Sequence, residues 1–277
     1  MCSLIHTHGH IEVSHYAFRW FARTAKGDGP VLWNLQSEDL VNFGEMMLHF
    51  TWWSFTNSMM VFSMSTVSTT RSIESFDSLV VLNEVSWQTY NELRDCNFNR
   101  NVRMTYDRGR LFLVSPGRLH ERIGAILARI VCAWTEMRGI AMLSGGSTTM
   151  KHPLINRGLE PDKCFYIQNE FAVRHSDTYD AVSDPPPDLV IEVDVTSLST
   201  IRMPIYAEFG VPEIWRWHEE KLEVHRLQGK SYVRVEDSAC LPGFPFDKAI
   251  ESLDERHNLD ETSLLVGFRK RCQVDSK

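Results

Sequence analysis

The sequence lacks several signatures that would assign it quickly to a functional class. Its six cysteines show no CxxC or CxH spacing, which argues against a zinc module and against a disulfide framework. Such scattered cysteines suit a reducing cytosol, so we expect a cytoplasmic protein. There is no GxSxG motif, no cysteine has an evident histidine partner, and the stretch LSGGST lacks the lysine of a phosphate-binding loop.

An overall excess of positive charge is also absent. The formal net charge is -7 and the pI is near 5.9, so the composition as a whole does not indicate a polyanionic partner. Arginine is nevertheless concentrated between Arg94 and Arg138, where nine arginines accompany four acidic residues. A local excess of this kind is what a phosphate-backbone binder needs, although such runs also serve simply to solvate a helix face.

The first 63 residues differ from the rest of the chain. No Asp, Glu, Lys or Arg occurs between residues 46 and 70, but polar residues such as His49 and Asn57 interrupt the apolar stretch. A membrane-spanning helix needs about 20 predominantly apolar residues, so we expect no membrane association. We interpret residues 1–63 as a poorly structured extension, with Met64 as a more usual start, and residues 64–277 as the domain.

From about residue 83 the pattern is that of a folded domain with mixed helices and strands. Residues 85–95 and 119–137 have helical spacing, and the second of these helices is amphipathic and closed by Gly139. Residues 102–116 predict a hairpin that turns at 107–109. Further strands are predicted at 140–146, 160–168, 185–196 and 212–236, and further helices at 204–210, with Pro204 in its first turn, and at 260–272. This order predicts an α/β or mixed α+β fold with a central sheet.

The strand predicted at 185–196, PPPDLVIEVDVT, carries three acids in an aliphatic core sequence. Side chains alternate along a strand, so Asp188, Glu192 and Asp194 share one face. Same-face neighbours lie about 7 Å apart, so Glu192 and Asp194 can bracket one ion, whereas Asp188 fits a turn at the strand's entry. If the two acidic strands pair, Asp162 approaches Glu192.

Glu121, in the first turn of the long helix, would add a third carboxylate to Asp162 and Glu192. Magnesium prefers such hard oxygen ligands. The alternative is a sheet surface whose acids are incidental. His120 could contact phosphate, although a histidine in a first helical turn is more often ordinary surface.

The segments GSTTM, GLEPDKCFYIQNE, PPDLVIEVDVTS, MPIYAEFGVPEIWRW and LEVHRL follow one another in a chain region that runs from about Val85 to Arg271. In this order they resemble the Uma-two family of restriction endonucleases, within the PD-(D/E)XK nuclease superfamily. The resemblance implies a restriction-endonuclease-like core, a central mixed sheet flanked by helices, and an endonuclease that hydrolyses DNA phosphodiester bonds with Mg²⁺ or Mn²⁺. It implies that Asp162 is the motif's first aspartate, Glu192 the acid of the (D/E)XK element, and Glu121 the helix glutamate. A homodimer would suit the cutting of two strands.

The chain departs from the family pattern at the lysine. Asp194 stands at the usual lysine position, and Arg202 stands where the family often places a lysine instead. Arginine stays protonated and cannot act as a base, although it can hold a phosphate or a developing negative charge. Arg202 is therefore expected to stabilise negative charge on the phosphate and to leave the activation of water to the metal. Lys163 is not expected to replace the missing lysine, because strand alternation points its side chain to the opposite face of the sheet.

Three other functions fit the same residues. One is a catalytically degenerate nucleic-acid-binding or regulatory protein of the same fold, and another is a hydrolase of a small phosphate ester. The third is a structural or interaction protein. A separation of Asp162 and Glu192 above about 8 Å would exclude a shared ion at normal coordination distances.

Overall fold

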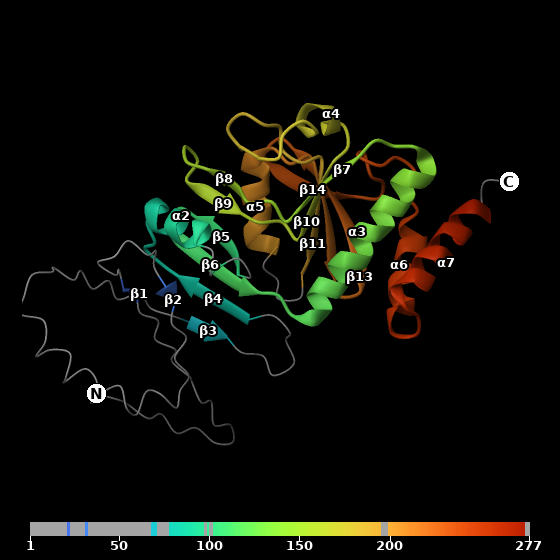
Figure 1. Cartoon of the computed structure of the whole chain (residues 1–277), viewed down its shortest axis with the longest axis horizontal. Helices are drawn as coiled ribbons and strands as arrows, with labels where there is room; N and C mark the ends of the chain where they lie inside the picture. The colour runs from blue at the N-terminus through green and yellow to red at the C-terminus, as the bar shows by residue number, and fades with distance from the viewer. Residues whose placement is uncertain are drawn as a thin grey trace, which may run out of the picture.

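A computed structural model describes residues 78–96, 99, 102–194 and 199–274, together with short strand segments at 21–22, 31–32 and 68–70. Apart from β1 (Phe21–Ala22) and β2 (Val31–Leu32), the predicted extension lies outside the described residues. The described residues form two six-stranded sheets with helices packed against them, which confirms the predicted mixed α/β class (Figure 1). Within the described residues, no helix is both long and apolar enough to cross a membrane.

The first sheet is antiparallel, with the order β3-β4-β6-β5-β9-β8. Its central hairpin turns at Arg108 and Gly109, both of which have positive φ, as the sequence predicts. Helix α2 (Trp87–Asp95) packs Tyr90 and Leu93 against this sheet. The strands are β3 (Ser68–Thr70), β4 (Ser78–Leu82), β5 (Arg103–Asp107), β6 (Arg110–Ser115), β8 (Met150–His152) and β9 (Arg157–Leu159).

The second sheet has the order β14-β13-β12-β11-β10-β7, and only its β11–β12 pair is parallel. Parallel neighbours need a crossover connection, and helix α5 (Ser199–Phe209) provides it. Pro204 lies inside α5 rather than in the predicted first turn, and its carbonyl oxygen accepts a hydrogen bond from Arg157. The strands are β7 (Leu143–Gly146), β10 (Lys163–Tyr166), β11 (Leu189–Val193), β12 (Glu213–His218), β13 (Lys221–Gln228) and β14 (Ser231–Val235).

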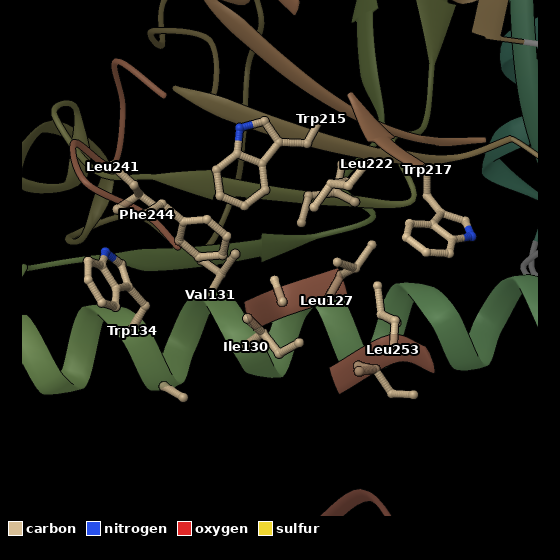
Figure 2. Packing of buried hydrophobic residues seen from close by; sticks show 14 of the residues in the cluster. Leu127, Ile130, Val131, Trp134, Trp215, Trp217, Leu222, Leu241, Phe244 and Leu253 are labelled. Atoms are coloured by element: carbon tan, nitrogen blue, oxygen red, sulfur yellow. The ribbon is translucent and has the colours of Figure 1, made fainter. Parts of the chain in front are cut away.

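Helix α3 (Arg118–Arg138) covers one face of the second sheet and ends, as predicted, at Gly139 in the left-handed conformation. Val131 of α3 points toward Phe244 (Figure 2), and both belong, with Ile130 and Trp215, to the main core. Burying one such aliphatic side chain contributes about 1.5–3 kcal/mol. Helices α6 (Phe246–Asp254) and α7 (Glu261–Val274) pack on α3 (Figure 1), and the remaining helical segments are α4 (Glu170–Val173) and η2 (Glu255–His257).

The two faces of β11 pack against different helices. Leu189, Ile191 and Val193 belong to the core beneath α3, whereas Val190 belongs to a second cluster that contains Ile205 of α5. This arrangement confirms the alternation predicted from the sequence. Glu192 therefore points toward α5.

Glu213, the first residue of β12, is fully buried. Its carboxylate accepts hydrogen bonds from Trp215 Nε1 at 2.7 Å, Ser238 Oγ at 2.5 Å and the Ala239 backbone nitrogen at 2.7 Å. A buried carboxylate is tolerated when several donors share its charge. Glu213 thus fixes the start of β12 against the segment that leads to α6.

Candidate active site

Asp162 and Glu192 come from paired strands. Strands β10 and β11 run antiparallel with Lys163 opposite Ile191, so the next step along both chains places Asp162 opposite Glu192. Both side chains are buried. Asp162 Oδ2 accepts a hydrogen bond from the Val193 backbone nitrogen at 2.7 Å, which fixes it against β11. Asp162 is the last residue of the short loop between β9, in the first sheet, and β10, in the second sheet. The site therefore lies where the two sheets join.

Arg202, from α5, is buried between these two acids. Its Nη1 atom lies 2.6 Å from Glu192 Oε2 and 3.9 Å from Asp162 Oδ1. Glu192 Oε2 and Asp162 Oδ1 are both close to this one nitrogen, so the distance between the two oxygens is below the limit of about 8 Å for sharing an ion. Burial is the largest single influence and would lower the pKa of Arg202, but Glu192, Tyr206 and Asp162 together outweigh it, so the pKa is raised. Arg202 therefore remains a cation.

The environment shifts the pKa values of the two acids in opposite directions. Burial raises the pKa of Glu192 from 4.5 to about 7, Arg202 opposes this shift, and the charge of Asp162 adds to it. Burial acts in the same direction on Asp162, but His120, Arg202 and Arg103 together hold its pKa below the usual range. Neighbouring carboxyl groups with separated pKa values are typical of sites that transfer protons.

His120 and Arg103 complete the surroundings of Asp162. His120 is buried and places Nε2 3.0 Å from Asp162 Oδ2, so the expectation of an ordinary surface histidine was wrong. Arg103, from β5, donates to Asp162 Oδ1 at 3.0 Å and to Glu121 Oε1 at 2.7 Å. Its partner Asp162 is 59 residues away in the sequence, and no local pattern signals such a contact.

Glu121 lies at the solvent edge of the site, with 47% of its side chain exposed. Arg103 pairs with one of its oxygens, and Lys163 Nζ lies 3.8 Å from the other. The Lys163 side chain runs beside Gly124 of α3, on the face of the sheet opposite Arg202, in agreement with strand alternation. The structure thus brings Glu121 close to Asp162 through a shared arginine.

The other two acids of the strand sequence have different partners. Asp188 Oδ2 accepts from the backbone nitrogens of Ile167 at 2.6 Å and Asn169 at 2.9 Å, which agrees with a strand-entry role. Asp194 is buried and accepts from Arg216 of β12 at 2.9 Å and 2.5 Å. A metal-binding role for Asp194 stays a prediction.

The side chains can be tested for their fit to a magnesium ion. Asp162 and Glu192 supply the oxygen donors and the spacing that such an ion needs. However, Arg202 Nη1 lies between them, and Arg103 is paired with both Asp162 and Glu121. Within the part of the chain that the structure describes, no three Asp, Glu, His or Cys side chains are grouped as a metal-binding set. As arranged, the site does not accommodate a magnesium ion between the two acids.

Comparison with known proteins places this site within one family. Residues 87–250, which include every residue of the cluster around Asp162, match the family model Uma2. No curated protein matches the sequence. The matched segment is more than half of the chain and contains both acids, the crossover helix and the first turn of α3. The chain therefore belongs to the Uma2 family, described as "Putative restriction endonuclease".

Proposed function

We propose that this chain is an endonuclease that hydrolyses phosphodiester bonds of DNA at the cluster formed by Asp162, Glu192 and Arg202. The observation that carries the proposal is the meeting of two buried acids from paired strands with a buried arginine. Membership of the Uma2 family supports a nuclease activity. Carboxylates and guanidinium groups held together are the groups that phosphoryl transfer uses for positioning and charge stabilisation.

Arg103 and Arg202 supply the positive charge that a phosphodiester requires. Burial works to lower the pKa of Arg103, but Asp162 and Glu121 outweigh it, so this arginine also remains charged. Its side chain is 16% exposed beside the more exposed Glu121, so the site opens to solvent on this side. A guanidinium can bind two phosphate oxygens at once, which favours Arg103 as the first contact of the substrate.

Glu192 is the candidate for proton transfer. A general base works best when its pKa is close to the working pH, and the pKa of Glu192 is about 7. Mg²⁺ or Mn²⁺, if bound, would supply an activated water, and Asp162 and Glu192 would hold it with help from Glu121 or Asp194. The positions of Arg202 and Arg103 mean that this ion requires a rearranged site.

A second function is favoured by one observation. Arg202 fills the position between the acids, as expected if the fold had kept nucleic-acid binding and lost catalysis. A catalytically degenerate binding protein of this kind would retain DNA without cleaving it. Cleavage and retention therefore have to be measured on the same preparation.

The deciding experiment is nicking of supercoiled plasmid by the full chain with Mg²⁺ or Mn²⁺ and with EDTA. Metal-dependent nicking that Glu192→Gln abolishes would support the nuclease. Glu208→Gln is a matched control, because Glu208 lies on α5 but pairs with Arg108 and Arg157 outside the cluster. Gel-shift retention of DNA without nicking would favour the degenerate binding protein, and light scattering of the same sample tests the predicted homodimer.

A further inference from the structure

Strand β14 forms one edge of the second sheet. It pairs with β13 on one side, and among the described residues no strand pairs with its other side. The other sheet edges are less suited to a further strand, because β3 and β8 have three residues each and the pairing of β7 with β10 contains a register shift. β14 has five residues in regular register. The N–H and C=O groups along such an edge are a template for another strand.

The turn before β14 determines which of its backbone groups point outward. The turn has two residues, begins with Gly229 at positive φ, and is followed by Ser231. In a hairpin of this kind the two residues that close the turn bond to each other, and so does every second pair after them. Ser231 and Val233 therefore bond to β13. Tyr232 and Arg234 direct their N–H and C=O groups away from the sheet.

We propose that β14 is the interface of a homodimer, in which it pairs antiparallel with β14 of a second copy and Val233 lies at the two-fold axis. In this register all five residues of the strand are paired. Tyr232 of each copy lies opposite Arg234 of the other, so the outward backbone groups meet. Lys230 lies opposite Glu236. A two-fold interface has to be self-complementary, and this segment meets that requirement.

Charge disfavours the neighbouring registers. A shift by one hydrogen-bond repeat would place Lys230 opposite Arg234 in one direction, and Arg234 opposite its own copy in the other. Like charges directly opposite each other destabilise a strand pair, whereas opposite charges stabilise it. Lys230 and Glu236 are exposed, and neither has an ion-pair partner among the described residues. Pairing across the two-fold axis gives each of them a partner.

The interface is small, so we expect the dimer to dissociate on dilution. The cluster around Asp162 and Glu192 is separated from β14 by strands β12 and β13. Each copy therefore keeps a complete cluster. The inference gives the predicted homodimer a surface, and it does not rest on the proposed nuclease activity.

Sedimentation velocity of the full chain without nucleic acid, over a wide range of protein concentration, tests the interface. The wild type should show an equilibrium between monomer and dimer. Lys230→Glu and Glu236→Lys each place two like-charged pairs across the axis, and each should raise the dimer dissociation constant on the order of tenfold. The double variant restores opposite charges and should dimerise like the wild type. Lys221→Glu is the control, because this exposed lysine lies at the turn between β12 and β13.

A second pair of variants tests the backbone pairing. Arg234→Pro removes an outward N–H group, which an edge strand tolerates, whereas Arg234→Thr removes the same side chain and keeps that group. Only the proline variant should abolish the dimer. A wild type that stays monomeric, single charge variants that dimerise like the wild type, or equal dimerisation of the two Arg234 variants would overturn the proposal. Plasmid nicking by a monomeric chain would leave the proposed nuclease function standing.

Discussion

Replacing Tyr206 by phenylalanine tests how the fold tolerates the buried carboxylate of Glu192. The Tyr206 hydroxyl donates to Glu192 Oε1 and accepts a hydrogen bond from Arg202 Nη2. Tyr206 is fully buried, and phenylalanine fills the same space without the hydroxyl, so Glu192 loses a donor. A hydrogen bond to a charged group contributes about 1.5–3 kcal/mol, so we expect Tyr206→Phe to lower the free energy of unfolding by about 2 kcal/mol at pH 8.

This loss should depend on pH in a defined direction. The pKa of Glu192 is raised from 4.5 to about 7, so the folded protein holds the proton more tightly than the unfolded chain. The stability from that proton is fully present below the unfolded pKa and is lost as the pH rises through the folded pKa. The Tyr206 hydroxyl supports the charged form, which dominates above pH 7. The defect of Tyr206→Phe should therefore be larger at pH 8 than at about pH 5.5.

Urea unfolding followed by tryptophan fluorescence at both pH values measures the effect. Tyr232→Phe is the control, because the Tyr232 hydroxyl donates to a neutral acceptor, the Val211 carbonyl oxygen, at 2.6 Å. The control should lose about 1 kcal/mol at either pH. A Tyr206→Phe defect that is equal at the two pH values, or matched by the control, would refute the claim that this hydroxyl stabilises ionised Glu192.

Three further substitutions test the buried hydrogen bonds and the close packing that stabilise the fold around the site. Glu213→Gln places an amide group opposite a backbone donor at Ala239 and should cost about 2 kcal/mol in urea unfolding. Gly158→Ala should cost about 1–3 kcal/mol by thermal unfolding, because the added carbon would lie 2.3 Å from the Tyr90 hydroxyl oxygen. Asp188→Ala removes the acceptor of two backbone donors and should cost about 2 kcal/mol in urea unfolding.

Local periodicity predicted much of the fold correctly. The hairpin at 102–116, the amphipathic helix that ends at Gly139 and the two faces of β11 all follow from patterns within a few residues. The approach of Asp162 to Glu192 was also predicted from the sequence, because it required only that two consecutive strands, β10 and β11, pair with each other. Helix α6 was not predicted, because proline and glycine immediately before it favour a loop.

The cations of the site were harder to predict than its acids. Arg103 reaches Asp162 from the other sheet, and one arginine among nine in the basic segment gives no signal of such a contact. His120 lies beside Glu121 in the sequence, but its burial depends on how the first turn of α3 meets the junction of the sheets. Arg202 was predicted to stabilise negative charge on a phosphate. Its position between the two acids was not predicted, because it depends on the path of the crossover helix α5.

The crossover helix also has a consequence for the order of folding. Glu192, Arg202 and Tyr206 lie on one continuous β11–α5–β12 unit, so their contacts close only short loops, whereas Arg103 and Asp162 are 59 residues apart. Contacts between residues near in sequence form at lower entropic cost. We expect hydrogen exchange during refolding to protect this unit before the β5–β9 pairing. Glu192 would then enter the protein interior already neutralised by its own arginine.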